Sequence, residues 1–263
     1  MKILRFIMKY CFALISAVYL FVFGFLWSKN RELITKIANH FGYYPGRIKP
    51  LLPKQELSWL IDGNIPISLS HITNKKNSMS CLDTACVIHF LKKANPENIF
   101  ELGTFDGQTT LNMAVNSNPQ AKIYTLDLPR TMAQDVKLRL EQSDKSYIEK
   151  DESGVIFKGK PCEGKITQLF GDSAQYDFLP FYGKMNMVFV DASHSYEYVI
   201  NDSSVALKLL RNGKGLIVWH DYSGSWDGVT KALNELYENN PDFKDLRHVD
   251  GTSFAYLLKN KNS

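Results

Sequence analysis

Acidic and imidazole side chains stand at the ends of two apolar segments of the sequence. The segment "MNMVFVDAS" reaches Asp191, with His194 three residues later, and "GLIVWHDY" reaches His220 and Asp221. In open parallel sheets, ligands bind at the carboxyl ends of the strands. Imidazole titrates near neutral pH and can take a proton from a hydroxyl group. We therefore predict that Asp191, His194, His220 and Asp221 are catalytic residues.

Structural roles are the alternative for the residues around these two strand ends. His194 could simply cap a helix that begins at Tyr196, whereas an imidazole beside a carboxylate at 220–221 is harder to explain by structure alone. Trp219, Tyr222 and Trp226 could form an aromatic wall for a substrate. For Trp219, ordinary core packing is the preferred interpretation.

A glycine-bearing turn and further strand-end acids form a second group of candidate residues. In "ELGTFDGQTT", Gly103 and Gly107 follow a short apolar segment, and Asp127 lies 20 residues beyond Gly107 (127 − 107). Glycines let a ligand approach the backbone, the start of a helix offers N–H donors, and an acid in this position accepts hydrogen bonds from ribose. A tight turn alone could explain the glycines. Acids at four strand ends, including Asp172, favour a binding site for a nucleoside-containing ligand.

Alternation of helical and strand patterns predicts the fold. Strands are expected over residues 98–103, 122–129, 165–173, 185–193 and 215–222, with a terminal hairpin over 245–250 and 253–259. Helical patterns between them predict an α/β fold, with a doubly wound and mostly parallel sheet and an antiparallel C-terminal hairpin. Residues 144–165 are polar and glycine-dotted, and a loop of this length is usually functional or mobile.

The N-terminus carries a long apolar segment. "CFALISAVYLFVFGFLW" (11–27) has no charge, and the apolar character extends back to Ile3. About 20 apolar residues span a bilayer, so we predict an uncleaved membrane anchor over 1–28; a signal peptide or a buried helix are the alternatives. A juxtamembrane helical connector is expected over 29–80 and a catalytic domain over 81–263. Basic residues flank both ends of the anchor and leave its orientation open.

Composition excludes several classes of protein. The net charge of +4 is mild and the basic residues are scattered, so nucleic acid is not an expected partner. Four cysteines in 263 residues are too few for a disulfide scaffold and favour a reducing compartment. The sequence gives no indication of an oligomeric state.

Several of these motifs together resemble the class I S-adenosylmethionine-dependent methyltransferases, in the branch of the small-molecule O-methyltransferases. The resemblance rests on "ELGTFDGQTT", "TLDLP", "FGDSAQYDF", "FVDASHSYEYVINDSSVALKLLRNGKGLIVWHDY" and "GTSFAYLLK", and it covers roughly residues 85 to 260. It implies a seven-stranded Rossmann-like sheet and S-adenosyl-L-methionine as the cofactor.

The resemblance also assigns roles to individual residues. The implied cofactor-binding residues are Glu101, Gly103, Thr104, Phe105, Gly107, Thr109, Asp127, Leu128, Asp172, Ser173 and Asp191. Some relatives bind Mg²⁺ through acids at the ends of the fourth and fifth strands, which makes Asp191 and Asp221 candidate metal ligands. This sequence departs from that pattern, because His220 stands where such relatives usually carry an acid.

The expected function is transfer of a methyl group to a hydroxyl of a small molecule, sugar or glycolipid, by an enzyme held at the membrane through its N-terminal helix. Because the cofactor is made in the cytosol, the catalytic domain is expected to be cytoplasmic. One alternative is a non-catalytic cofactor-binding module tethered to a membrane assembly. A nicotinamide oxidoreductase is disfavoured, because the third glycine of its fingerprint is missing.

Overall fold

The computed structural model describes residues 2–40, 48–61, 63–73 and 78–259. The chain forms two compact units, Met1–Arg47 and Ile48–Ser263. The second unit begins well before residue 81, where the sequence placed the start of the catalytic domain. Parts of the predicted connector, residues 41–47, 62 and 74–77, lie outside the described residues.

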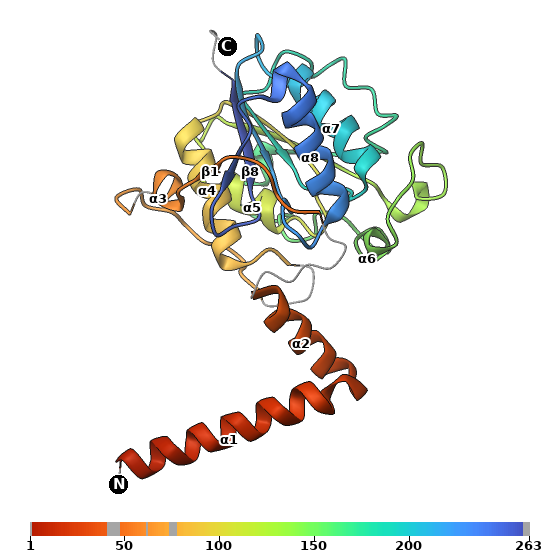
Figure 1. Ribbon diagram of the computed structural model, residues 1–263. Coiled ribbons are helices and arrows are strands. Elements are labelled where there is room, and N and C mark those ends of the chain that lie inside the picture. Colours follow the sequence, from red (N-terminus) through yellow and green to blue (C-terminus); the bar gives the residue numbers. More distant parts are fainter. Residues whose placement is uncertain (1, 41–47, 62, 74–77, 260–263) are drawn as a thin grey trace. The chain divides into compact units, whose positions relative to one another are not determined.

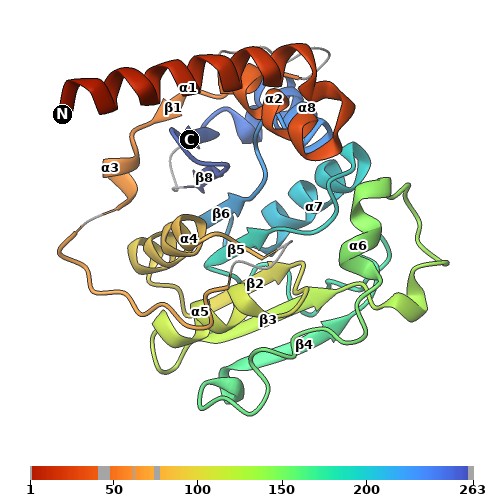
Figure 2. The same cartoon turned by 90° about the horizontal axis from the view of Figure 1, so that it is seen from below.

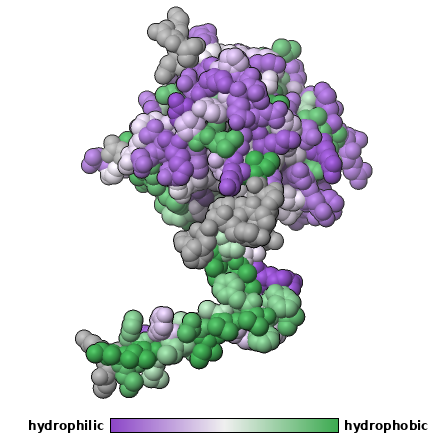
Figure 3. All heavy atoms as spheres, viewed as in Figure 1, coloured by the Kyte–Doolittle hydropathy of each residue, from purple (hydrophilic) through white to green (hydrophobic). Residues whose placement is uncertain are grey.

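The N-terminal unit consists of an apolar helix, a short turn and a second helix. Helix α1 (Lys2–Val22) contains a stretch, Ile3–Val22, that is long and apolar enough to cross a membrane by length and composition. A 3₁₀ turn (Gly24–Leu26) follows and α2 (Ser28–His40) comes next. Apolar side chains cover the surface of α1 (Figure 3). The apolar run continues to Trp27, but the helix itself ends at Val22.

The second unit is built on one eight-stranded sheet in the order β1-β7-β8-β6-β5-β2-β3-β4 (Figure 1). The strands are β1 (Lys54–Gln55), β2 (Asn98–Leu102), β3 (Lys122–Asp127), β4 (Ile166–Phe170), β5 (Met187–Val190), β6 (Gly215–Trp219), β7 (Arg247–Val249) and β8 (Ala255–Lys259). Strands β2 to β6 pair in parallel with one another, and β8 is antiparallel to both β6 and β7. The mostly parallel sheet with an antiparallel C-terminal hairpin is confirmed.

One strand was not expected from the sequence. The two-residue strand β1 pairs in parallel with β7, so the sheet has eight strands where the resemblance implied seven. A segment of two residues is too short to show the alternation that predicts a strand. It pairs because Pro53 and Gln55 offer carbonyl oxygens to the backbone N–H groups of His248 and Asp250.

Helices cover both faces of the sheet. Helices α4 (Cys81–Ala94) and α5 (Gln108–Asn116) lie on one face, whereas α7 (Tyr196–Leu209) lies on the other (Figure 2). Helix α8 (Asp227–Asn239) packs with α7. Strand residues alternate between the two layers: Ile99 packs in the α4/α5 core and Phe100 in the α7/α8 core. Burial on both faces explains why these strands are almost continuously apolar.

The segment before α4 belongs to the second unit. Tyr222 accepts backbone hydrogen bonds from Leu51 and Leu52, and Leu60 of the short helix α3 (Leu57–Leu60) is fully buried. These contacts come from side chains far along the chain. They explain why the unit begins at residue 48.

Two asparagines of α5 hold an extended part of this segment. Asn112 exchanges two hydrogen bonds with the backbone of Ser70, and Asn116 does the same with Ser68. The two side chains are four residues apart and therefore lie on one face of the helix. They pair with main-chain groups as a neighbouring strand would, and the segment then leads to Met79.

Candidate active site

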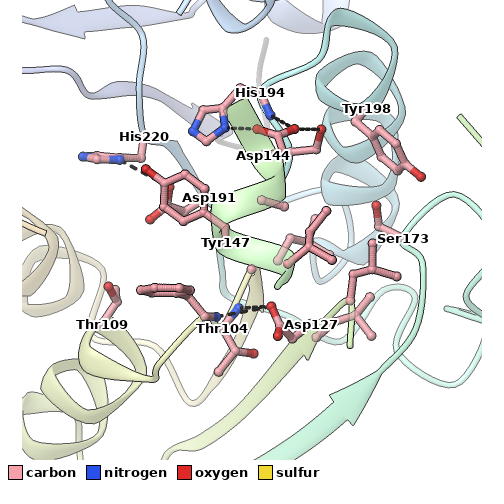
Figure 4. Close-up of a pocket in the computed structure, with 18 of the residues that line it drawn as sticks. Thr104, Thr109, Asp127, Asp144, Tyr147, Ser173, Asp191, His194, Tyr198 and His220 are labelled. Atoms are coloured by element: carbon pink, nitrogen blue, oxygen red, sulfur yellow. Dashed lines mark hydrogen bonds and ion pairs between the residues drawn. The ribbon is translucent and has the colours of Figure 1, made fainter. Parts of the chain in front are cut away.

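A cavity of about 280 Å³ lies at the carboxyl ends of the parallel strands (Figure 4). It sits where β2 and β5 meet, which is the point where the strand order reverses and where ligands bind in such sheets. The predicted residues that line it are Gly103, Thr104, Phe105, Thr109, Asp127, Leu128, Asp172, Ser173, Asp191, His194, His220 and Asp221. Glu101 and Gly107, also predicted for the cofactor site, are not among its lining residues.

The glycine turn is required by close packing at the reversal point. Gly103 has a φ of +96°, and a Cβ placed there would lie 2.0 Å from the carbonyl oxygen of Asp191. Both the backbone conformation and the space therefore demand glycine. At Gly107 (φ +90°), a Cβ would lie 2.7 Å from the Phe157 ring. This glycine therefore leaves room for the long loop over residues 144–165, which we call the excursion.

Glu101 lies beneath the cavity and does not line it. Its carboxylate is fully buried and accepts hydrogen bonds from Thr110 and Thr125. Burial raises the pKa of Glu101 to about 8, against the effect of these two hydrogen bonds, which lower it. Glu101 thus supports the turn from below, and its contact with the cofactor stays a prediction.

Asp127 is held by donors from two different segments. One oxygen accepts from the backbone N–H groups of Thr104 and Phe105, at 3.3 and 3.2 Å. The other oxygen lies 2.7 Å from the ammonium of Lys150 and accepts a hydrogen bond from the hydroxyl of Ser153. The carboxylate is thus oriented toward the end of the cavity where a ribose was expected.

Asp172 is more fully engaged by the protein than its predicted role suggested. It accepts hydrogen bonds from the backbone of Lys137 and Ala174 and from the side chains of Gln175 and Tyr198. Burial alone would raise the pKa of Asp172, but these donors lower it below its usual value. Ser173, beside it, also lines the cavity.

Acids and imidazoles alternate across the other end of the cavity. His194 donates to Asp144 from Nδ1 (2.5 Å) and faces Asp221 with Nε2 (2.9 Å). Asp221 in turn lies 3.2 Å from Nδ1 of His220, and the same Nδ1 lies 3.3 Å from Asp191. We call these five residues the acid–imidazole network. Asp191 is the member that lies toward the rest of the cavity, between His220 and Tyr147 (Figure 4).

Comparison with known proteins identifies this part of the chain. Residues 100–222, which hold the glycine turn and all four predicted catalytic residues, match the family model described as a methyltransferase domain. This segment is therefore similar to methyltransferase domains. The predicted resemblance to methyltransferases is confirmed. No protein of curated function matches the sequence.

Solved structures of methyltransferases resemble the chain at low identity. TomG from Streptomyces achromogenes, an O-methyltransferase involved in tomaymycin synthesis and solved with S-adenosylmethionine, is 19% identical, with 70% of this chain and 82% of that chain covered and a TM-score of 0.45. An O-methyltransferase from Bacillus cereus, in complex with S-adenosylhomocysteine, is 15% identical (70% and 84% covered, TM-score 0.47). The methyltransferase PaMTH1 from Podospora anserina, bound to S-adenosylhomocysteine, is 16% identical (70% and 80%, TM-score 0.47).

The acid–imidazole network holds both imidazoles in the charged form. Burial would lower the pKa of His194, but Asp144 and Asp221 raise it to about 9. For His220, burial is likewise outweighed by Asp221 and Asp191, which raise its pKa well above the ordinary value. Burial would raise the pKa of Asp221, yet the neighbouring imidazoles hold it far below its usual value. The acidic side chains of the network therefore stabilise two imidazolium groups, and Asp221 stays ionised between them.

The aromatic residues near the methyltransferase site have separate roles. Trp226 stacks on His194 with ring centroids 3.7 Å apart, whereas Tyr222 is fully buried and bonds to Asn234. Trp219 is buried and donates to Ser203, as the packing interpretation predicted. The expected aromatic wall is thus wrong for Tyr222, which packs inside the domain.

The structural alternative for His194 is also wrong. Ser195 is the N-cap residue of α7 and accepts the backbone hydrogen bond of Tyr198, so His194 is not needed to cap the helix. Its side chain instead joins the acid–imidazole network.

The donors of the predicted metal site do not fit Mg²⁺. Asp191, His220 and Asp221 offer ligand atoms within 4.8 Å of one another, but one of the three is an imidazole. Mg²⁺ takes oxygen ligands in octahedral geometry. In addition, Nδ1 of His220 lies between the two carboxylates, at 3.3 Å from Asp191 and 3.2 Å from Asp221, where a metal ion would have to bind.

Several residues of the site were missed by sequence reasoning. Asp144, Tyr147 and Lys150 line the cavity, and all three come from the 144–165 excursion. The length and polarity of that segment indicated function but no single residue. Asp83, 3.9 Å from Nε2 of His220, stands at the start of α4, where the pattern Ser80-x-x-Asp83 marks a helix N-terminus.

Proposed function

We propose that this protein transfers the methyl group of S-adenosylmethionine to a hydroxyl oxygen of an acceptor. The proposal rests on one observation: the two ends of a single cavity carry different chemical groups. At one end Asp127 is oriented as an acceptor for hydroxyl groups, and at the other end lies the acid–imidazole network. Asp191 lies between them and has 24% of its side chain exposed.

The cofactor would occupy the end that contains the glycine turn and Asp127. Gly103 brings the backbone close to the ligand, Thr109 stands in the first turn of α5, and Leu128 follows Asp127 along the cavity wall. Asp127 would accept hydrogen bonds from the ribose hydroxyls, in exchange for part of its contact with Lys150 and Ser153. Ser173 and Asp172 would border the adenine.

The bound cofactor supplies an electrophilic methyl group on a sulfonium sulfur. The acceptor oxygen forms a bond to that carbon while the carbon–sulfur bond breaks, which yields a methyl ether and S-adenosylhomocysteine. The proton of the acceptor hydroxyl passes to the carboxylate of Asp191, because the pKa of Asp221 is held too far below its usual value for Asp221 to take a proton. The protein's contribution is to align the acceptor beside Asp191, with Asp221 as a hydrogen-bond acceptor for the hydroxyl.

The proposal also covers the chemical class of the acceptor and the location of the enzyme in the cell. Asp144, Asp191 and Asp221 line the acceptor end, which favours an uncharged polyhydroxyl compound, such as a sugar or a glycolipid headgroup, over an anion. The apolar helix Ile3–Val22 would anchor the enzyme in a membrane. The catalytic domain would face the cytosol, where the cofactor is made.

Calorimetry on the full chain in detergent micelles tests the cofactor assignment. The full chain is titrated with S-adenosylmethionine and, separately, with NAD⁺. Binding of the first without the second is expected. No binding of S-adenosylmethionine would overturn the proposal.

A labelling experiment tests the transfer. The full chain receives S-adenosylmethionine with an isotopic methyl label, together with water-soluble and lipid extracts of cells. Label is expected in a product that resists alkali, because a methyl ether survives where a methyl ester is hydrolysed. Binding without any transfer would favour the non-catalytic module instead.

A further inference from the structure

Both ring nitrogens of His194 are engaged by carboxylates. Nδ1 donates to Asp144 over 2.5 Å, and Nε2 lies 2.9 Å from Asp221. His194 was predicted as a catalytic residue, which requires a ring atom that can touch the acceptor. Neither nitrogen can take up a proton from a hydroxyl group without first losing one of these bonds.

The faces of the His194 ring are covered as well. Trp226 stacks on it at 3.7 Å and 17°, and the ring of Tyr147 lies 5.6 Å away. The residue is only 6% exposed. Its ring is therefore fixed in plane and position, which suits a support for another side chain better than a group that exchanges protons.

Asp144 makes the contacts that fix this ring. One oxygen accepts from Nδ1 of His194, and the other accepts from the backbone N–H of His194 and from the hydroxyl of Ser193. Asp144 is 3% exposed and comes from the excursion 50 residues earlier in the chain. No other residue of the excursion that the structure describes bonds to the ring of His194.

The position of Asp221 depends on this support. Asp221 has a φ of +63°, a conformation that non-glycine residues seldom adopt. Its contacts with His194 and His220 both fall on Oδ2, so Oδ1 bonds to neither imidazole and is available to an acceptor hydroxyl. A shift of the His194 ring would therefore move the carboxylate that the acceptor meets.

We propose that Asp144 is a positioning residue, which fixes His194 so that His194 orients Asp221, and that His194 does not itself take the acceptor proton. This inference rests on the proposed function for its effect on turnover. The excursion thereby becomes part of the acceptor site, because it supplies the outermost carboxylate of the acid–imidazole network.

The test compares three variants of the full chain in detergent micelles. Asp144→Asn removes the charge, Asp144→Glu restores it, and Asp151→Asn is the matched control, an exposed acid of the same excursion. With the acceptor fraction found in the labelling experiment, Asp144→Asn is expected to lower kcat about 10- to 100-fold, because small displacements of reacting groups are costly. Cofactor affinity should stay within about twofold and Asp144→Glu should recover most of the lost kcat.

A second readout needs no acceptor. An imidazole stacked on indole quenches its fluorescence, so the emission of Trp226, obtained by subtracting the spectrum of Trp226→Phe, reports the position of the His194 ring. It should rise in Asp144→Asn and remain low in Asp144→Glu and Asp151→Asn. This readout separates the two proposals, because it changes even if no methyl transfer is found.

Two results would overturn the inference. One is an Asp144→Asn protein with unchanged Trp226 emission, which would show that the ring does not depend on Asp144. The other is a His194→Gln variant with a much larger loss of kcat than both Asp144→Asn and Asp221→Asn, which would make His194 the proton acceptor. Circular dichroism of each variant shows whether it has folded.

Discussion

The two ends of the cavity are built in different ways. At the cofactor end, the turn after β2 and the carboxylate at the end of β3 come from adjacent strands. At the acceptor end, the network combines two strand ends with Asp144 from the excursion, and Asp83 of α4 lies 3.9 Å from His220. The cofactor end is thus local in sequence, whereas the acceptor end is assembled from distant segments.

This difference indicates which parts of the site are fixed by the fold and which parts can differ in sequence without changing it. A parallel sheet brings strand ends to one edge whatever the loops contain. The loops and helix starts that complete the acceptor end are outside this constraint. The following predictions test the division between the two ends.

Asp221→Asn should have the largest effect, at the acceptor end. Asparagine also tolerates the left-handed backbone that Asp221 adopts (φ +63°), so the substitution removes the charge with little strain. We expect kcat to fall about 1000-fold, with cofactor affinity nearly unchanged, as measured by methyl transfer and calorimetry. Asp245→Asn, an exposed acid, is the control. A large loss of cofactor affinity in Asp221→Asn would mean that the two ends are not separable.

Gly103→Ala tests the point at which the two ends touch. The added Cβ would meet the carbonyl oxygen of Asp191 in an unfavourable backbone conformation, so the free energy of unfolding should fall by about 3 kcal/mol. Gly159→Ala is the matched control, with a φ of +71° and no atom within 4 Å of the added Cβ. Urea denaturation measures both. Equal losses would show that backbone strain alone, and not the contact with Asp191, requires Gly103.

Glu101→Gln tests whether the buried carboxyl group beneath the cofactor end makes the free energy of unfolding depend on pH. The folded-state pKa of Glu101 is raised to about 8 from 4.5, chiefly by burial, so its contribution to stability is complete below pH 4.5 and is lost as the pH rises to about 8. The loss between pH 4.5 and 8 should be on the order of 4 kcal/mol. Unfolding measured between pH 4.5 and 8.5 should show a flatter profile for Glu101→Gln than for the wild type. Identical slopes would contradict the assignment.

Asp127→Asn should give the smallest of these effects, confined to the cofactor end. Loss of the charge weakens hydrogen bonds to ribose, which contribute about 1.5–3 kcal/mol when one partner is charged. Calorimetry should show the dissociation constant of S-adenosylmethionine rising about 10- to 100-fold. With saturating cofactor, kcat should be nearly restored. Asp135→Asn, an exposed acid after β3, should leave both unchanged.

Sequence reasoning succeeded where local pattern determines structure. The five parallel strands and the terminal hairpin lie where the apolar segments predicted them, and the central strands β2 and β5 are buried on both faces. The same holds for Asp127, the last residue of β3, and for Asp191, which follows β5 directly. The glycine at 103 was identified, but the reason for it, the Asp191 carbonyl oxygen of another strand, required the structure.

The residues that sequence reasoning missed depend on long-range contacts. Asp144 has no periodic pattern around it, and only its pairing with His194, 50 residues later, gives it a role. Glu101 is a different case: the pattern placed it near a strand end, and its buried carboxylate accepts hydrogen bonds from Thr110 and Thr125 and is not among the residues that line the cavity. Alternation along the strand decides such cases, and a five-residue strand gives few positions from which to read it.

The pairing of Asn112 and Asn116 with the main chain at Ser70 and Ser68 has a consequence for how new specificities arise. These asparagines bond only to backbone N–H and C=O groups, so almost any side chain is acceptable at positions 68 and 70. The segment they fasten continues to Ser78 and Met79, which border the cavity. Mutations at residues 68 and 70 can therefore change the side chains near the entrance to the pocket while the attachment of the segment to α5 stays the same.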